Sequence, residues 1–354
     1  MAMKAITQSE YGSAEVLRVD DIPKPTPQAG EALVRVYAVG VGPEVWHPMT
    51  GLPYLVRVMG YGLRRPKNPV PGRDLAGIVE AVGEGVTTLH PGDQVYGTGD
   101  GTLAEYARAP AERLAPKPAN LSFVQAAAVP VSGCAALLAV RDEGRIQAGQ
   151  SVLVVGASGG VGSFAVQLAR SFGAEVTGVC SGEKADLVRS LGVDQVIDYT
   201  REDFTEGEQK YDLIIDTAGR RPLSQLRRAL VPKGTLVIVG GEGGDRVSGG
   251  FIQRQLGAMA VSPFVGHRLR AVISKERTEE LLYLRDVIEA GSVTPLVGQT
   301  FPLEEAAKAL SDEDEGHGRG KKVVTIVTEP EPRRPRTRED PREWGPGGPD
   351  RPDA

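Results

Sequence analysis

One stretch of the chain constrains the fold more than any other: residues 152–176 read VLVVGASGGVGSFAVQLARSFGAEV. An apolar run of strand length leads into a glycine-rich turn, and a stretch with helical spacing of apolar residues follows. Gly159 and Gly162 occupy the second and third glycine places of the G-x-G-x-x-G pattern, whose first place is Ala157 here. The second place lets the backbone approach a pyrophosphate, and the third lets the helix pack closely on the strand. The pattern predicts a strand, turn and helix that bind a dinucleotide at the helix N-terminus.

The segments around this turn continue the alternation of strands and helices. They are, in chain order, SVLVV, SFAVQLARSFG, EVTGVC, KADLVRSLG, QVIDY, DLIIDTAG and TLVIVGG. Such alternation is typical of a parallel, doubly wound sheet, and in that context a glycine turn without a ligand is the weaker alternative. The chain before about residue 122 instead shows short alternating segments such as EALVRVYAV and DLAGIVEAV between Gly and Pro turns, which predicts a β-rich unit.

The last third of the chain is predicted to leave the parallel sheet. EELLYLRDVIEAG is expected to be helical, QTFPLEEAAKAL to be a second helix, and KKVVTIV to be a closing strand that returns to the first unit. The tail, residues 329–354, is dominated by Pro, Arg, Asp and Glu. It cannot bury enough apolar surface to offset chain entropy, so we expect it to be disordered.

Length and charge narrow the class of protein. A chain of 354 residues exceeds most single cores, so two domains are expected. The net charge of -5 offers no basic field for nucleic acid, and no apolar run approaches the ~20 residues of a membrane helix. The N-terminus lacks an apolar signal core, and two cysteines, Cys134 and Cys180, are too few for a disulfide framework. We expect a cytoplasmic protein with a small-molecule substrate and neither a nucleic-acid nor a membrane partner.

The choice of cofactor depends on the end of the second strand, where an NAD site places Asp or Glu against the ribose 2′-hydroxyl. Cys180 and Ser181 occupy that place, and neither is acidic. Ser181 leaves room for a 2′-phosphate, Lys184 is near enough to balance its charge, and Tyr199 offers a phenolic hydrogen bond. Lys184 as a solvated helix residue and Tyr199 as a packing residue are the plainer alternatives, and Glu183 is close enough to turn toward the ribose. Together these residues favour NADPH, and the predicted cofactor-binding set is Ala157, Ser158, Gly159, Gly160, Val161, Gly162, Ser181, Lys184, Tyr199, Ala218 and Gly240.

The chain resembles the medium-chain dehydrogenase/reductase superfamily, and within it the zinc-free quinone oxidoreductase-like branch. The matching segments are EYGSAEVLRVDDIPKP, EALVRVYAVGVGP, PGRDLAGIVEAVGEGV, PGDQVYG, LSFVQAAAVPVSG, GASGGVG, LGVDQVIDY, YDLIIDTAG and KGTLVIVGG. The resemblance implies an α/β protein with a GroES-like β-rich catalytic domain, formed by both chain ends, around a Rossmann domain with a doubly wound parallel sheet. It places the catalytic domain at 1–126 and 291–328 and the NADP-binding domain at 127–290, with the cofactor in the cleft between them. Members of the family commonly pair their nucleotide domains, so a homodimer is expected.

The departures from the family pattern bear on the chemistry. Zinc alcohol dehydrogenases of the superfamily place a cysteine ligand where this chain has Gly42, and a histidine ligand where it has Arg73. Neither residue is a plausible zinc donor, so no metal is predicted. The quinone reductase branch usually has Asn-Pro-x-Asp where residues 42–45 read GPEV, and it commonly has Thr at the nicotinamide where this chain has Ala135.

The substrate site is expected beside an unusual stretch, residues 51–69 (GLPYLVRVMGYGLRRPKNP), which we call the wall segment. Its apolar content predicts a mostly hydrophobic pocket wall, and a surface helix is the alternative. Candidate donors to the substrate oxygen are Tyr54 and Arg73, with Asp74 orienting Arg73, although Asp74 could equally be a structural acceptor at a strand start. We expect an NADPH-dependent oxidoreductase that transfers hydride to a quinone, enone or enoyl group without zinc. The alternatives are an NAD(P)-dependent alcohol dehydrogenase for simple alcohols and ketones, and a non-catalytic NADPH-binding sensor or partner protein.

Overall fold

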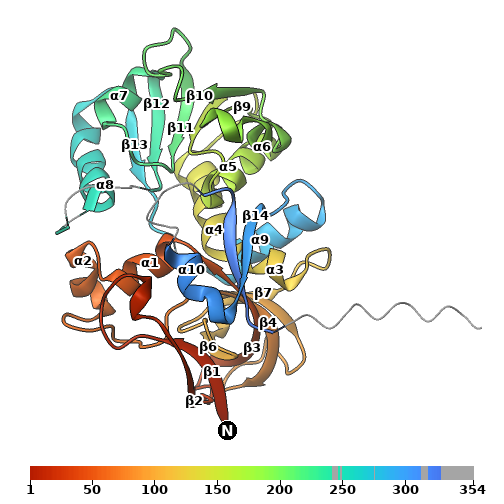
Figure 1. Ribbon diagram of the computed structural model, residues 1–354. Coiled ribbons are helices and arrows are strands. Elements are labelled where there is room, and N and C mark those ends of the chain that lie inside the picture. The colour runs from red at the N-terminus through yellow and green to blue at the C-terminus, as the bar shows by residue number, and fades with distance from the viewer. Residues whose placement is uncertain (241–245, 248, 275, 312–317, 328–354) are drawn as a thin grey trace, which may run out of the picture.

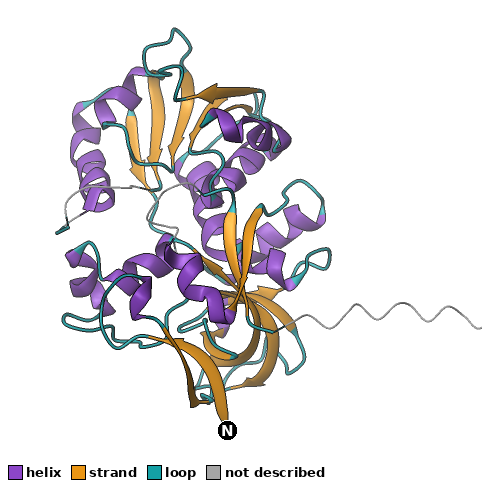
Figure 2. Ribbon diagram, viewed as in Figure 1, coloured by secondary structure: helices purple, strands orange, loops and turns teal. Residues whose placement is uncertain are grey.

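Two sheets lie at opposite ends of the molecule, with the helices α4 (Pro130–Leu137) and α5 (Gly160–Ser171) between them (Figure 1). The computed structural model describes residues 1–240, 246–247, 249–274, 276–311 and 318–327. The arrangement confirms the predicted class, an α/β protein with one β-rich and one parallel-sheet unit (Figure 2). The tail predicted to be disordered, residues 329–354, lies outside the described residues.

The parallel sheet has six strands in the order β10-β9-β8-β11-β12-β13. All five pairings are parallel, as expected for apolar strands joined by helices. The chain order reverses between β8 and β11, which is the switch point at which doubly wound sheets bind ligands. The strands are β8 (Ser151–Val155), β9 (Glu175–Cys180), β10 (Gln195–Asp198), β11 (Tyr211–Asp216), β12 (Leu230–Ile238) and β13 (Arg268–Ala271).

The β-rich unit holds a seven-stranded sheet in the order β14-β15-β3-β4-β5-β7, with β6 paired to β3, and a separate β1-β2 pair. Two of its strands come from the far end of the chain, because β15 pairs antiparallel with β3 and parallel with β14. The strands are β1 (Ala2–Thr7), β2 (Arg18–Pro23), β3 (Glu31–Val41), β4 (Asp74–Val82), β5 (Gln94–Thr98), β6 (Tyr106–Pro110), β7 (Leu114–Pro116), β14 (Val297–Pro302) and β15 (Lys321–Thr325). The domain boundaries placed at 126, 290 and 328 stay predictions.

The remaining helices cover the two sheets and the junction. They are α1 (Pro43–Thr50), α2 (Tyr54–Val56), α3 (Phe123–Ala127), α6 (Ala185–Ser190), α7 (Leu223–Arg228), α8 (Gly249–Val261), α9 (Thr278–Glu289) and α10 (Ala306–Ser311). The 3-10 turns are η1 (Ala14–Val16), η3 (Ala111–Arg113), η5 (Gly182–Lys184), η6 (Ser262–Phe264) and η7 (Leu303–Glu305), and the π-helical turns are η2 (Arg57–Tyr61) and η4 (Leu138–Glu143). No helix of the described residues is long and apolar enough to cross a membrane.

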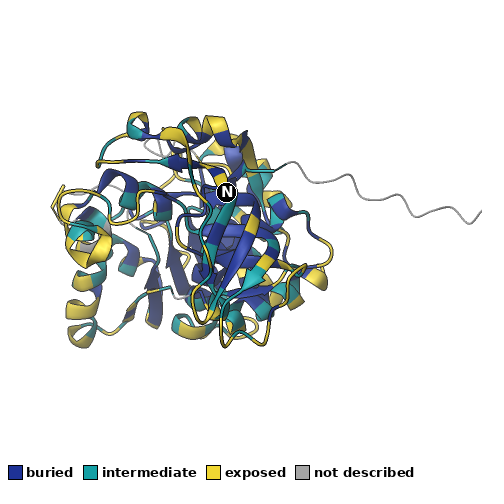
Figure 3. Cartoon of the chain, turned by 90° about the horizontal axis from the view of Figure 1, so that it is seen from below, coloured by how far each residue is buried: buried dark blue, intermediate teal, exposed yellow. Residues whose placement is uncertain are grey.

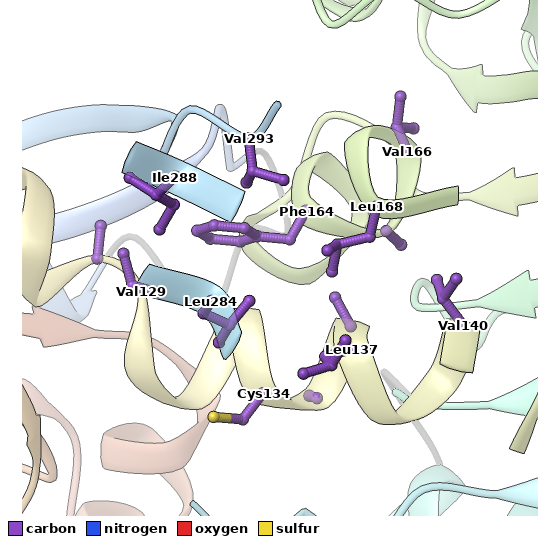
Figure 4. Close-up of a cluster of buried hydrophobic side chains, with 14 of the residues drawn as sticks. Val129, Cys134, Leu137, Val140, Phe164, Val166, Leu168, Leu284, Ile288 and Val293 are labelled. Atoms are coloured by element: carbon purple, nitrogen blue, oxygen red, sulfur yellow. The ribbon is translucent and has the colours of Figure 1, made fainter. Parts of the chain in front are cut away.

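A hydrophobic cluster joins the two units through α4, α5 and α9. Figure 4 shows Phe164 of α5 between Ile288 of α9 and the α4 helix, with Leu284 and Leu137 close by. All four side chains are almost completely buried, and burying such a side chain contributes about 1.5–3 kcal/mol. The cluster therefore fixes the helix that opens at the glycine turn relative to both sheets.

The secondary-structure predictions hold for most elements, with one boundary corrected. EELLYLRDVIEAG forms α9 and KKVVTIV contains β15, as predicted. The stretch QTFPLEEAAKAL is only partly helical, because residues 299–302 complete β14 and α10 begins at Ala306. Pro302 lacks a backbone N–H and fixes its own φ, so it suits the end of an edge strand better than the middle of a helix.

Candidate active site

The glycine turn between β8 and α5 has the geometry that its sequence predicts. Gly156 adopts φ +85°, which L side chains avoid. A Cβ on Gly162 would lie 2.1 Å from the Gly156 carbonyl oxygen, so the helix packs on the turn too closely for any side chain. A Cβ on Gly159 would meet only the Gly156 oxygen, at 3.4 Å. The space beside Gly159 is therefore open, and it lies at the helix N-terminus.

The N-terminus of α5 is suited to bind the phosphates of a dinucleotide. Gly159 is the N-cap residue, and no side chain caps the helix there. First-turn N–H groups and the positive end of the helix dipole attract a pyrophosphate. Ala157 and Ser158 are buried beneath the turn, while Gly160 and Val161 are half-buried in the first turn of the helix.

The turn also contacts the returning end of the chain. The Gly320 backbone N donates to the Ser158 carbonyl oxygen at 2.8 Å, and Gly159 and Gly320 form an isolated parallel bridge. Gly320 directly precedes β15 of the other sheet. The cofactor turn and the catalytic unit are thus hydrogen-bonded to each other.

Two basic side chains, Lys184 and Arg319, lie close after β9, where a ribose 2′-phosphate would bind. The buried Lys184 donates to the Gly318 carbonyl oxygen at 3.3 Å, and Arg319 donates to the Glu183 carbonyl oxygen at 3.4 Å. Burial lowers the pKa of Lys184, and the nearby charges of Arg319 and Arg220 lower it further, against the opposing effect of Glu183. Burial is the largest cause of this shift, so the case for an anion here depends on the nearby basic side chains and not on the pKa. Arg319 is not among the residues predicted from the sequence, because it reaches the cofactor side from more than 130 residues away.

The other predicted cofactor residues lie along the same carboxyl edge of the sheet. The Tyr199 backbone N donates to the Cys180 carbonyl oxygen at 3.1 Å, and the Tyr199 side chain is 46% exposed. Gly240 follows β12, and a Cβ there would lie 2.3 Å from the Thr217 carbonyl oxygen. Ala218 follows β11. The structure therefore places the turn residues, Ser181, Ala218 and Gly240 at the ends of neighbouring parallel strands.

A buried ion network lies where α1, β4 and β15 meet. Asp74, the first residue of β4, accepts a hydrogen bond from the Val131 backbone N at 3.0 Å, and its Oδ2 lies 3.3 Å from Lys321 Nζ. Lys321 also donates to Glu44. A Cβ on Gly42 would lie 2.8 Å from Glu44 Oε2, so this ion pair fills the space that a side chain at position 42 would need. Glu44 and Lys321 are not among the residues predicted from the sequence. The two lysines that open the apolar strand β15 are the signal that points to Lys321.

Burial controls the protonation of this network. Burial is the largest influence on Asp74 and, with the Glu44 charge, raises its pKa to about 7, against the lowering effect of Lys321 and the Val131 hydrogen bond. Burial opposes the charge of Lys321, but the carboxylates of Glu44 and Asp74 outweigh it and raise its pKa. Lys321 therefore stays charged while Asp74 titrates near neutral pH.

The expected pairing of Arg73 with Asp74 is wrong. Arg73 Nη2 lies 2.5 Å from Oε2 of Glu276, in the segment after β13, while Asp74 pairs with Lys321. Adjacent residues of an extended chain point to opposite faces, so Asp74 turns into the network and Arg73 turns away from it. The alternative of Asp74 as a structural acceptor at the strand start fits its bond from Val131.

Tyr54, the third predicted catalytic residue, belongs to the wall segment. It opens α2, and its side chain is 43% exposed. The Arg57 guanidinium lies 4.8 Å from the centre of the Tyr54 ring, while the backbone N of Tyr54 donates to the Arg246 carbonyl oxygen at 2.8 Å. The wall segment is neither a single helix nor a plain loop, because α2 continues into the π-helical η2.

The described residues contain no group of three or more His, Cys, Asp or Glu side chains placed to hold a metal ion.

Comparison with known proteins identifies the family. Residues 28–119 match the alcohol dehydrogenase GroES-like domain, and residues 191–324 match the zinc-binding dehydrogenase family. A mouse quinone oxidoreductase is 33% identical over 338 residues, which covers 92% of this chain and 98% of that protein. A chloroplastic NADPH-dependent alkenal/one oxidoreductase of Arabidopsis thaliana is 33% identical over 341 residues, 91% of this chain and 79% of that protein. The solved structure of a quinone oxidoreductase from Coxiella burnetii has a TM-score of 0.82 at 27% identity and covers 92% of this chain and 100% of that chain. With this coverage and this site, the chain belongs to the medium-chain dehydrogenase/reductase superfamily, has quinone oxidoreductases among its relatives, and is an NAD(P)H-dependent oxidoreductase.

Proposed function

We propose that the enzyme uses NADPH to reduce a double bond or quinone conjugated to a carbonyl group, without a metal ion. The observation that carries the proposal is Arg73, a guanidinium held at the junction of the two units where zinc enzymes of the superfamily have a histidine ligand. A fixed cation of this kind stabilises negative charge that develops on a substrate oxygen. The relatives named as quinone and alkenal/one oxidoreductases support the same substrate class.

Different residues would bind different parts of the cofactor. The open space at Gly159 and the N-terminus of α5 would hold the pyrophosphate, while Lys184 and Arg319 would hold the ribose 2′-phosphate. The bound reduced nicotinamide supplies the hydride. The position of the basic side chains Lys184 and Arg319 after β9 supports NADPH over NADH, as does the NADPH-dependent relative.

The substrate side is formed by Arg73 and the wall segment. The side of the molecule that carries α2 and α8 in Figure 1 is largely exposed or half-buried in Figure 3. Apolar side chains of the wall segment stand open there, namely Leu55, Val58, Met59 and Leu63. An apolar wall with a few donors suits a conjugated carbonyl compound and displaces water from it. Conjugation in the acceptor spreads the developing charge, so hydrogen-bond donors can supply the stabilisation that a metal ion supplies to simple ketones.

The test is a cofactor-oxidation assay over a panel of quinones, enones, aldehydes and ketones, with wild type and Arg73→Ala. We expect quinones or enones to be the fastest acceptors, activity to persist in chelator, and Arg73→Ala to lower turnover about 100-fold, the cost of removing one oxyanion donor. Tyr54→Phe is expected to lower turnover by less, since Tyr54 is 43% exposed and its ring contacts Arg57. Faster reduction of plain aldehydes than of any conjugated acceptor would overturn the proposal, and no turnover with any acceptor would favour a binding role.

A further inference from the structure

Arg73 is paired with a buried carboxylate, Glu276. The Glu276 side chain is 2% exposed, whereas the Arg73 side chain is 32% exposed. Glu276 follows β13 of the parallel sheet, and Arg73 precedes β4 of the other sheet, 203 residues away in sequence. The carboxylate is therefore the buried, fixed member of the pair, and the guanidinium is the member with a free face.

Glu276 is itself held on its other oxygen. The Ser274 hydroxyl donates to Glu276 Oε1 at 2.9 Å, which leaves Oε2 for Arg73. Burial opposes ionisation of Glu276, but the charge and hydrogen bond of Arg73, with the bond from Ser274, outweigh it and lower its pKa. Glu276 is thus a carboxylate in the working pH range, and a carboxylate offers Arg73 a directional, charge-assisted bond.

The pair lies beside α4, the helix whose segment 132–135 the family resemblance places at the nicotinamide. Burial raises the pKa of Cys134 in this segment, and the charges of Glu276, Glu280 and Asp74 raise it further. Asp74, which follows Arg73, accepts a hydrogen bond from the Val131 backbone N of α4 at 3.0 Å, and α9, which begins two residues after Glu276, packs on α4. Arg73 and Glu276 are therefore each within two residues of a segment that contacts α4.

We propose that Glu276 is the positioning residue of the active site: it holds Arg73 as the hydrogen-bond donor to the substrate oxygen and, by cancelling its charge, selects neutral acceptors over carboxylate-bearing ones. The inference rests on the proposed function, in which Arg73 faces the substrate. A guanidinium carries five N–H donors, and the bond to Glu276 occupies one of them. The remaining donors are pre-oriented, which avoids the ordering of a long side chain during the reaction.

The charges of Arg73 and Glu276 determine which acceptors the site prefers. The Arg73–Glu276 pair is neutral as a unit, so it binds an oxygen that becomes negative only during the reaction. A permanently anionic acceptor would meet a buried carboxylate a few ångströms behind the donor. Glu276→Gln removes that negative charge while keeping the size of the side chain and an oxygen for Ser274.

The experiment compares wild type with Glu276→Gln on a matched pair of acceptors, methyl 3-benzoylacrylate and 3-benzoylacrylate, which differ by one carboxylate. For the neutral ester we expect kcat to fall at least tenfold, because the donor loses its orientation. For the acid we expect KM to fall about threefold, because the guanidinium charge is no longer cancelled. Glu276→Asp should recover part of the kcat on the ester. Glu31→Gln is the control, since Glu31 pairs with Arg108 at 3.5 Å at the far end of β3.

The outcomes separate the two proposals. If wild type reduces neither acceptor nor any quinone, the proposed function fails. If wild type reduces the ester and Glu276→Gln leaves kcat on the ester unchanged, the positioning role fails while the function stands. If KM for the acid does not fall relative to KM for the ester, the charge-selection part of the inference fails. Should Glu276→Gln unfold, Ser274→Ala weakens only the orientation of the carboxylate, and an unchanged kcat on the ester would then overturn the inference.

Discussion

Lys184 and Arg319 reach the end of β9 from different parts of the chain, and their chemistry predicts how the enzyme distinguishes its two cofactors. Lys184→Met and Arg319→Met should each weaken NADPH binding at least tenfold and leave NADH binding nearly unchanged. Tenfold corresponds to about 1.4 kcal/mol, which one charge-assisted hydrogen bond can supply. Titration of both cofactors by intrinsic fluorescence measures the two constants.

Lys210→Met, which removes an exposed lysine bonded to the Gly207 carbonyl oxygen, serves as the control. Equal losses for NADPH and NADH in the Lys184 variant would place that residue at the pyrophosphate or the fold instead. A stronger affinity of wild type for NADH would show that Glu183 takes the ribose.

The residues of the site differ in how far the sequence predicts them. The glycine turn is a local pattern, and the structure shows the close contact that its spacing requires at Gly162. The pairings of Arg73 and Asp74 were not predictable from spacing, because their partners come from 203 and 247 positions away in the chain and adjacent side chains point apart. The partners in a buried ion pair are brought together by the folded topology, so a local sequence motif does not predict them.

At the scale of elements, the turn before α5 allows stability and cofactor binding to be changed separately. Gly162→Ala would place a Cβ 2.1 Å from the Gly156 oxygen, so we expect a loss of about 1–3 kcal/mol in the free energy of unfolding. In Gly159→Ala the new Cβ would lie near only one atom, the Gly156 oxygen, at 3.4 Å. The backbone at residue 159 is extended, a conformation that alanine adopts. The substitution should leave unfolding nearly unchanged but weaken cofactor binding, because the methyl group enters the open space.

Urea unfolding and NADPH titration of both variants test this separation. A Gly159→Ala variant that binds NADPH as wild type does would show that the cofactor lies elsewhere. An unchanged unfolding midpoint for Gly162→Ala would show that the helix can move away from the turn.

The start of β4 gives the protein a pH-dependent stability. The pKa of Asp74 is raised in the folded state from 3.8 to about 7, so the neutral form stabilises the fold at low pH and this contribution is lost as the pH rises through about 7. Asp74→Asn removes the titration and leaves Lys321 paired with Glu44. The variant should therefore gain free energy of unfolding relative to wild type between pH 5 and pH 8.

Urea unfolding at the two pH values measures that difference. Asp186→Asn, on the surface of α6, is the control for loss of an exposed carboxylate. A constant difference between Asp74→Asn and wild type at both pH values would contradict the prediction.

The order of the elements was largely predictable, whereas the wall segment was not. In residues 151–238 the spacing of apolar residues differs clearly between strands and helices, and their alternation predicted the parallel sheet. In residues 51–69 apolar, basic and glycine residues follow no single period, and the backbone there turns at Gly60 and Gly62, both with φ +111°. A segment held by hydrogen bonds to residues 246 and 247 takes its shape from those contacts.

At the scale of the whole molecule, the edge of the parallel sheet bears on assembly. β13 is an edge strand among the described residues, and the side chains of Phe264 and Ile273 beside it are 88% and 74% exposed. An unpaired edge flanked by exposed apolar side chains favours pairing with another strand. We propose that two copies pair through this edge as a homodimer.

Phe264→Asp together with Ile273→Asp should convert the dimer to a monomer, because each charge would be buried at the interface. Sedimentation equilibrium over a range of concentrations measures the mass. Val58→Asp, on the wall segment, is the control for adding charge at an exposed apolar position. A wild-type mass equal to one chain, or a dimer that survives the double variant, would contradict the proposal.

The return of β15 to β3 also sets an order of events during synthesis. Residues 322–325 pair with residues 38–41, so the catalytic sheet stays incomplete until residue 325 has left the ribosome. The six-stranded sheet between them contains every strand that it needs by residue 271. The nucleotide-binding half can therefore fold first, and the same late segment that closes the catalytic sheet also brings Gly320 to the glycine turn and Lys321 to Asp74. A nascent chain acquires its assembled active site only at the last step, after the cofactor cradle already exists.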